Sequence, residues 1–371
     1  MHEVDHSALA TTVLSSAFVL AMLFGAIARG THFCTMGAIA DIVSMKDWTR
    51  MRMWVLGIAV AMIGFNAMVG LGWIEARNTI YAGPRLLWLS LIVGGLMFGF
   101  GMVLASGCGS KSMVRIGGGN LKSLVVLMVL GLSAFATLKG ITAVIRTSTV
   151  DRAIVEFSHG QDLPTLVSAA TGFATPWVAG TLGLAIGLTL LAWVLSKPEG
   201  RNAQVWLGGA GIGAVVVAMW WVSGRLGYLA EDPNTLQESF LVTNSRRMEA
   251  ISMVAPVGYA LDWLLLFSDK SKMLTIGIVS VAGVISGSAV VALATRTFRW
   301  EGFSNTEDTA NHLVGGILMG IGGVMALGCT VGQGLSGIST LSLGSMLALA
   351  SIVAGALLGL HYQIWRLDRL G

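Results

Sequence analysis

Three cysteines are the residues of this chain best suited to specific chemistry, and two of them end a repeated segment. Gly94–Cys108 returns as Gly315–Cys329, with eight of fifteen positions identical and Gly-Cys at the end of both copies. A neutral thiol is a weak hydrogen-bond donor and a soft, polarizable contact. It therefore suits a soft sulfur atom better than a hard oxyanion or cation. The repetition predicts that both thiols act along one path.

Glycine-rich turns contain both Gly-Cys pairs and predict breaks in two membrane helices. The first reads Gly-Cys-Gly-Ser-Lys from Gly107, and the second reads Gly-Cys-Thr-Val-Gly-Gln-Gly from Gly328. Non-helical backbone at membrane depth is buried in protein or lines a cavity, where its free N–H groups can form an anion-binding nest. The alternative is that the glycines only allow close helix packing and the cysteines fill space. The candidate pathway residues are Cys34, Cys108, Cys329, Gly107, Gly109, Ser110, Lys111, Gly328, Thr330, Gly332, Gln333 and Gly334.

Lys111 and Gln333 each have two possible roles. The third cysteine, Cys34, has no counterpart in the second repeat. Lys111 either attracts an anion or reaches the membrane surface, and Gln333 either donates to an anion or caps a helix end. Cys34 lies in a glycine-containing segment after the first apolar stretch, but the corresponding residues 294–303 contain no cysteine. The path is therefore expected to carry three thiols rather than four.

Membrane helices must position these residues, as the composition indicates. Of 371 residues, 54% are hydrophobic and 11% are charged, and the mean hydropathy is +0.77, whereas a soluble domain carries about 25% charged residues. The 49 glycines far outnumber the 6 prolines, so glycine is the expected helix breaker. We predict an all-α polytopic membrane protein in contact with membrane lipid.

Several function classes are excluded by what the sequence lacks. The net charge of +4 comes without a basic run, so no nucleic-acid partner is expected. Three cysteines beside apolar helices do not form a disulfide framework. The sequence has no nucleotide-binding loop, acyl-transfer triad or zinc motif. We therefore expect no enzyme activity, no cofactor and no bound metal.

Nine transmembrane helices with re-entrant half-helices are predicted from the apolar stretches of spanning length. The expected spans are Ala8–Ala28, Met53–Ile74, Leu86–Ala105, Leu124–Ile145, Thr175–Leu195, Val205–Ser223, Met273–Ala294, Leu313–Leu327 and Leu341–Tyr362. Met253–Phe267 is too short to span comfortably and is expected to be re-entrant or interfacial. An odd number of spans makes the two Gly-Cys motifs face opposite sides, so the halves are predicted to be inverted repeats.

The nine predicted spans divide the chain into three parts and suggest how it is oriented in the membrane. The expected parts are residues 1–145 with the Cys34 and Cys108 motifs, residues 146–270 with connecting spans and loops, and residues 271–371 with the Cys329 motif. Within the connecting part, residues 146–174 and 224–250 are expected to be loops or interfacial helices, with an amphipathic surface helix at 235–250. Basic residues flank the first two spans on one side, which favours an external N-terminus and an internal C-terminus.

These motifs resemble the YeeE/YedE family of bacterial sulfur-compound transporters. The matching pieces are Phe33–Ala38, the helix ending at Cys108 with its glycine-rich exit, and Gly315–Gly334. The resemblance covers about residues 10–145 and 270–362. The chain departs from the family pattern at His32, where arginine is common, and at Lys111, where glycine is common.

The resemblance implies uptake of thiosulfate across the bacterial inner membrane by an hourglass-shaped fold of two inverted halves. It implies that Cys34, Cys108 and Cys329 line a central constriction and contact the sulfur anion by S–H···S hydrogen bonds. It also implies a small cytoplasmic sulfur-carrier protein as a partner of some members, and a selenium compound as an alternative substrate.

Two other functions remain open from the residues alone. A membrane thiol–disulfide reductant carrier would also place cysteines in inverted repeats, but it needs a pair that opens and closes a disulfide. A soft-metal channel would use three thiolates, but no Met-x-x-x-Met or Cys-x-x-Cys arrangement supports it. The preferred hypothesis is a transporter of a small sulfur anion.

Overall fold

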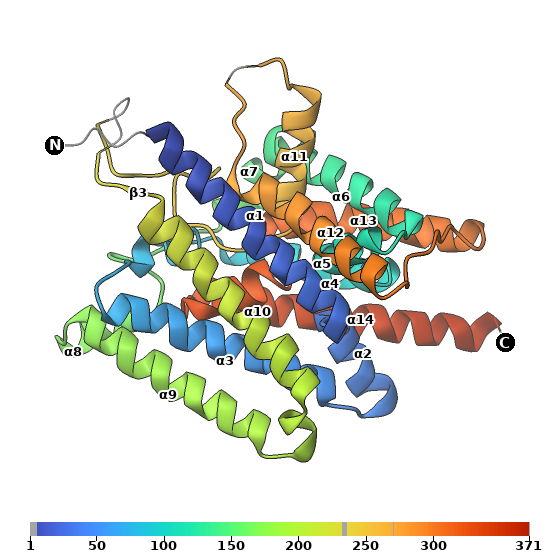
Figure 1. Ribbon diagram of the computed structural model, residues 1–371, viewed down its shortest axis with the longest axis horizontal. Helices are drawn as coiled ribbons and strands as arrows, with labels where there is room; N and C mark the ends of the chain where they lie inside the picture. The colour runs from blue at the N-terminus through green and yellow to red at the C-terminus, as the bar shows by residue number, and fades with distance from the viewer. Residues whose placement is uncertain (1–5, 232–235, 270, 371) are drawn as a thin grey trace.

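The computed structural model describes residues 6–231, 236–269 and 271–370, which form a bundle of long helices (Figure 1). The α-helices are α1 (His6–Thr31), α2 (Thr35–Met45), α3 (Thr49–Gly70), α4 (Trp88–Leu104), α5 (Gly109–Gly117), α6 (Leu121–Lys139), α7 (Ile141–Ser148), α8 (Leu163–Thr171), α9 (Thr175–Leu195), α10 (Ala203–Trp221), α11 (Ala255–Leu265), α12 (Ile276–Ala294), α13 (Thr306–Met325) and α14 (Leu343–Leu370). The short turns of helix are η1 (Ala76–Asn78), η2 (Val150–Arg152), η3 (Pro198–Arg201), η4 (Val222–Leu226) and η5 (Gly332–Gly337), of which η4 and η5 are π-helical.

Two small antiparallel ribbons cover one end of the bundle. Strands β1 (Arg85–Leu86) and β2 (Val155–Glu156) form one, and β3 (Tyr228–Leu229) and β4 (Ser239–Phe240) form the other. Each strand has two residues, so the ribbons tie loops together and do not form a sheet that could enclose a site.

Eight helical stretches among the described residues are long and apolar enough to cross a membrane, which confirms a multi-pass α-helical protein. They are Ser7–Met45, Thr49–Gly70, Trp88–Gly117, Leu121–Lys139, Thr175–Leu195, Ala203–Leu226, Ile276–Ala294 and Leu343–Arg369. The ninth expected span lies in α13, whose 20 residues begin with a polar turn containing Glu307 and Asp308. In Figure 1, α1 begins at one end of the molecule and α14 ends at the other.

The connecting region differs from its prediction at one point. Residues 236–250 contain no α-helix, so the expected amphipathic helix at 235–250 is wrong where the structure describes it. Their backbone is instead hydrogen-bonded to other loops, with Leu241 N donating to Gly227 O at 2.8 Å and Met248 N donating to Asn78 O at 2.9 Å. Helix α11 has 11 residues, which is short of the ~20 that a span needs.

The two helices of the repeated motif, α4 and α13, cross in antiparallel directions and exchange equivalent contacts. A Cβ added at Gly94 would lie 2.7 Å from Gly322 O, and one added at Gly322 would lie 2.5 Å from Gly94 O. The same exchange links Gly101 and Gly315, at 2.8 Å and 2.6 Å. Such close approach of backbones is what small residues at membrane helix interfaces permit. Gly94 of α4 thus meets Gly322, the counterpart of Gly101, and Gly101 meets Gly315, the counterpart of Gly94, as a local two-fold axis requires.

Both motif helices also end in the same backbone turn. Ser106 and Leu327 occupy equivalent positions, and both have a left-handed φ of +55°. The glycine that follows each donates its N–H five residues back, Gly107 to Met102 O and Gly328 to Gly323 O, both at 2.8 Å. This is the Schellman arrangement, which satisfies carbonyl groups left free at a helix C-terminus. Each helix therefore ends immediately before its cysteine, and these buried carbonyl groups keep hydrogen-bond donors.

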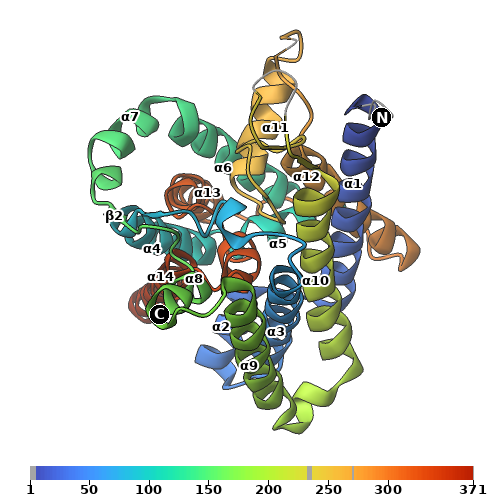
Figure 2. The ribbon, with the colours of Figure 1, turned by 90° about the vertical axis from the view of Figure 1, so that its left-hand side faces the viewer.

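Short helices follow these turns and lie inside the bundle. Figure 2, turned by 90°, shows α5 among the long helices, and α5 contacts α1, α6 and α12. The corresponding η5 contacts α3, α10 and α14. These are the broken-helix elements that the glycine-rich turns predict. The division at residues 145 and 271, the inverted relation of whole halves and the hourglass outline stay predictions.

The crossing of α4 and α13 predicts a sharp difference between two glycine-to-alanine substitutions. Gly322→Ala should lower the free energy of unfolding by about 1–3 kcal/mol, because its methyl group meets backbone atoms that cannot move aside independently. The matched control is Gly180→Ala in α9, where the nearest atom to an added Cβ is 3.9 Å away. Thermal unfolding of the purified protein in detergent measures both. Equal stability of the two variants would contradict this packing.

Candidate functional site

Cys34 stands where the chain turns from α1 into α2. After α1 the residue His32 takes a left-handed φ of +57°, and Cys34 then caps α2. Its Sγ accepts a hydrogen bond from Gly37 N at 3.3 Å. Because a cap satisfies an N–H group that the helix itself leaves free, this cysteine has a structural role that the sequence motif did not indicate.

Cys329 makes the equivalent local contact at the start of the second broken helix. Its Sγ accepts from Gly332 N at 3.4 Å, and its carbonyl accepts from Gln333 N at 2.7 Å. Cys108 occupies the N-cap position of α5 without a cap hydrogen bond, and its Sγ lies 3.2 Å from the Ser110 hydroxyl. Each of the three sulfurs therefore lies where a short helical segment begins, and helix N-termini carry positive partial charge.

The three cysteines come from distant parts of the chain to one buried region. Side-chain interactions link Cys34 with Cys108 and Cys108 with Thr330, and Cys329 is an electrostatic neighbour of Cys108. Cys34, Cys108 and Cys329 are exposed by only 9%, 1% and 0%, and all three are free thiols. Within the described ranges, no three His, Cys, Asp or Glu side chains are grouped so that they could hold a metal ion. The arrangement offers three soft sulfur contacts.

Basic side chains surround the Cys34 and Cys108 side of this region. Lys111, one turn into α5, lies within electrostatic range of both thiols and of Arg50 and Arg115. A Cβ added at Gly107 would lie 3.1 Å from Lys111 Cγ and 3.6 Å from Arg115 Nη1. Of the two interpretations of Lys111, this placement favours the attraction of an anion. Arg115 follows Lys111 by four residues on the same helix, and that spacing is the signal that could have identified it.

The Cys329 side is lined by uncharged polar groups. Gln333 Nε2 donates to Ala326 O at 2.5 Å, so this side chain caps the end of α13. Among the described residues its Oε1 has no hydrogen-bond partner, whereas the buried Thr330 side chain interacts with Cys108 and the buried Tyr81 hydroxyl with Ser252. Buried polar atoms normally have partners. The amide oxygen of Gln333 can only accept and is therefore available to water, whereas the Thr330 and Tyr81 hydroxyls can donate to an anion.

The remaining glycines of the second turn permit close contacts with these groups. An added Cβ would lie 2.7 Å from Ser252 Oγ at Gly332 and 2.8 Å from Trp54 Cζ2 at Gly334. Gly109 is less tightly enclosed, with its nearest neighbour at 3.6 Å. Tyr81, Ser252 and Trp54 were not predicted as site residues, because each comes from a segment far from the Gly-Cys motifs and shows no motif of its own.

A bundle of apolar helices with polar and thiol groups buried at its broken helices defines a multi-pass membrane transport protein. A family model described as sulphur transport matches residues 30–358. The chain therefore belongs to the sulphur transport family, the YeeE/YedE family that its motifs resemble.

Two relatives agree with this assignment over most of their length, and a third agrees over a shorter segment. The chain is 25% identical over 331 residues to a protein named thiosulfate transporter TsuA from Escherichia coli, with 87% of each chain covered. It is 26% identical over 352 residues to a protein of the same name from Spirochaeta thermophila, covering 92% of this chain and 96% of the relative. A probable transporter YedE from Salmonella typhimurium is 34% identical over 112 residues, which are 29% of this chain and 26% of that protein.

The cap made by Cys34 predicts that stability and sulfur chemistry can be separated at this position. Cys34→Ala should lower the free energy of unfolding by about 0.5–2 kcal/mol, because it removes the acceptor for Gly37 N. Cys34→Ser should stay near the wild-type stability, since its hydroxyl can accept the same N–H. Met319→Leu, which removes a buried sulfur from the interior of α13, is the control, and thermal unfolding in detergent is the measurement. If Cys34→Ser unfolds as readily as Cys34→Ala, the cap contributes nothing.

Proposed function

We propose that this protein takes up thiosulfate across the bacterial inner membrane by passing the anion along Cys34, Cys108 and Cys329. The observation that carries the proposal is the meeting of Cys34, Cys108 and the Thr330 side chain from three separate segments. Membership of the sulphur transport family and the two relatives named thiosulfate transporters support the substrate class.

Charge and softness would act on different atoms of the anion. The helical segments that begin at the cysteines present positive partial charge to any anion, and Lys111 adds a full charge beside Cys34 and Cys108. The thiols then contact the terminal sulfur of thiosulfate, which is its soft and polarizable atom. Neutral thiols are weak donors, so the anion is bound loosely enough to leave, as conduction requires. No thiol needs to be oxidised or ionised.

The two repeated turns would deliver the anion from opposite sides. We propose residues 1–145 and 271–371 as inverted halves of an hourglass, with residues 146–270 connecting them. The antiparallel crossing of α4 and α13, with its exchanged glycine contacts, is what two such halves would produce where they meet. The remaining proposed pathway residues are Gly107, Gly109, Ser110, Gly328, Gly332, Gln333 and Gly334.

The sidedness follows from the basic residues near the ends of the spans. We propose that α1 begins outside the cell, so that its C-terminal end with Arg29 and the start of α3 with Arg50 face the cytoplasm. A small sulfur-carrier protein on that side would receive the anion. Membrane lipid would surround the apolar outer faces of the helices.

Substitution of the two motif cysteines tests the thiol path. Cys108→Ser and Cys329→Ser should each reduce the initial rate of thiosulfate uptake about tenfold or more, because losing about 1.4 kcal/mol of differential contact changes the preference tenfold. Met319→Leu removes a fully buried sulfur from α13 with little change of volume and should leave uptake unchanged. Uptake of labelled thiosulfate into proteoliposomes measures all three. Normal uptake by both serine variants would assign the cysteines to packing.

Competition between anions tests the selectivity. External sulfate in large excess should leave thiosulfate uptake nearly unaffected, because sulfate has no soft atom to contact a thiol and a nest of N–H groups reads only charge. Unlabelled thiosulfate should compete fully, and selenosulfate should compete measurably. The labelled anion is followed in a strain that lacks other sulfate and thiosulfate uptake. If external sulfate competes as well as thiosulfate, the thiols do not select the substrate.

A further inference from the structure

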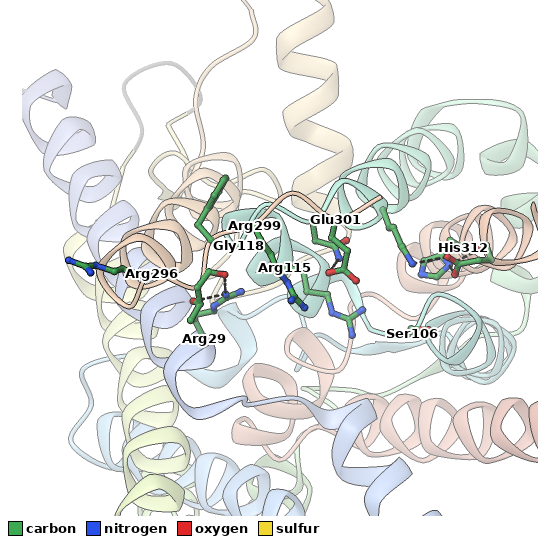
Figure 3. A pocket seen from close by; sticks show the side chains of 13 residues that line it. Arg29, Ser106, Arg115, Gly118, Arg296, Arg299, Glu301 and His312 are labelled. Carbon is green, nitrogen blue, oxygen red and sulfur yellow. Dashed lines mark hydrogen bonds and ion pairs between the residues drawn. The ribbon is translucent and has the colours of Figure 1, made fainter. Parts of the chain in front are cut away.

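A cavity of about 680 Å³ lies at one end of the bundle, where α1, α5 and α12 end and α6 and α13 begin (Figure 3). Its walls reach from exposed loop residues to Ser106 and Gly118, which flank the α5 segment that begins at Cys108. The cavity is lined by Arg29, Ser106, Arg115, Gly118, Asn120, Lys122, Arg296, Thr297, Phe298, Arg299, Glu301, Asp308 and His312. It therefore lies beside the first Gly-Cys turn, at the end of the bundle where α1 ends.

The charges of this cavity are unbalanced. Lys122 and Asp308 pair with each other at 2.7 Å, and this hydrogen bond holds the pKa of Asp308 at about 2. Glu301 accepts a hydrogen bond from Asn120 Nδ2 at 2.8 Å. Throughout the described ranges, no carboxylate lies within 4.0 Å of the guanidinium groups of Arg29, Arg115, Arg296 or Arg299. Four cations in one cavity thus lack a charged partner.

Three of these arginines are placed to act together. Arg29 is held by Thr297, whose Oγ1 accepts from Nη2 at 3.1 Å, and its Cζ would lie 2.9 Å from a Cβ at Gly118. Arg115 lies beside Gly107, the residue before Cys108. In Figure 3 the Arg115 and Arg299 side chains point toward the middle of the cavity, whereas Arg296 points away from it. The guanidinium groups of Arg29, Arg115 and Arg299 are called the arginine site below.

We infer that the arginine site binds a small doubly charged oxyanion, thiosulfate or sulfate, in series with the thiol region. Guanidinium groups present planar pairs of donors that match the oxygens of oxyanions, and none of the three is engaged by a carboxylate. The cavity has room for such an ion with some of its water but not for a folded partner. The position of the site on a transport path rests on the proposed function, whereas its affinity for oxyanions does not.

The arginine site should differ from the thiols in what it recognises. Its guanidinium N–H groups contact the oxygens of an anion and respond to its charge, so sulfate and thiosulfate should bind with similar affinity. The thiols contact the terminal sulfur and distinguish the two anions. An anion that has passed the thiols would then pause at the arginines, and sulfate on the arginine side would occupy the same place. Sulfate should therefore slow uptake only from the end of the molecule where α1 ends.

Binding of labelled sulfate to the purified full-length protein in detergent tests this inference. At low ionic strength, Arg115→Gln and Arg29→Gln should weaken sulfate binding at least tenfold. Arg296→Gln changes the net charge equally but removes a side chain that points away, so its binding should stay within twofold of wild type. Arg115→Lys keeps the charge without the planar fork and should bind with intermediate affinity, which shows that loss in Arg115→Gln is not loss of the fold. Binding should also weaken with added salt, because exposed charges are screened.

The binding and transport results test the arginine site and the proposed thiol path independently. Cys108→Ser should bind sulfate as wild type does while failing to transport thiosulfate. If wild type binds no sulfate, or if Arg296→Gln and Arg115→Gln lose binding equally, the arginine site does not exist, and the thiol path is unaffected. If an acidic peptide binds at the arginines and sulfate does not displace it, the inference is likewise wrong. If the cysteine variants transport normally while the arginine variants lose sulfate binding, the thiol path fails and the arginine site stands.

Discussion

The hydrogen bonding of backbone that leaves a helix at membrane depth is the constraint on which this structure depends. Lipid offers no partner to free N–H and C=O groups, so each break must be closed by the protein itself. At the two repeated turns, Gly107 and Gly328 donate back into the preceding helices. At the segments that follow Cys34 and Cys329, the cysteine sulfur accepts an N–H group. The cysteines are thus part of the closure of the breaks as well as the proposed contacts for the anion.

The same hydrogen-bonded turn occurs at both helix breaks, so the backbone around the site is symmetric. The side chains that line the site are not. The α4–α13 crossing makes the same pair of glycine contacts twice, but Lys111 and the nearby arginines lie on the Cys108 side, whereas uncharged groups such as Gln333 and Tyr81 lie on the Cys329 side. An anion would therefore meet neutral donors on one side of the thiols and full positive charges on the other. That difference would give the proposed path an electrostatic direction, even though the backbone turn is repeated.

Much of the helical architecture could be predicted from sequence, because apolar stretches of spanning length have few alternatives in a membrane. The Gly-Cys ends were also visible, since the motif repeats. The failures have physical causes. Residues 235–250 suggested a surface helix, but the described part of that segment pairs with loops near residues 78 and 227, and such partners are invisible in a local pattern. The expected span Leu124–Ile145 stops at Lys139, whose Nζ lies 2.8 Å from Asp262 Oδ2.

The site residues also fall into those that the sequence identifies and those that only the packing of distant segments brings together. Those inside the repeated turns could be identified, and for Gln333 the structure adds the hydrogen bond to Ala326 O that the helix-cap interpretation expects. Arg29, Arg115 and Arg299 come together only because α1, α5 and α12 end at one place, and no spacing in the sequence carries that information. Tyr81 and Trp54 likewise reach the second turn only through the packing of segments that are distant in sequence.

The most direct measurement is a structure of the protein with selenosulfate, in which selenium replaces the terminal sulfur and is located by its anomalous scattering. The account predicts a selenium peak within about 4 Å of one or more of the Cys34, Cys108 and Cys329 sulfurs, with the oxygens turned toward Lys111 or the backbone N–H groups. A peak remote from all three sulfurs, or an anion that turns its oxygens to the thiols, would contradict it.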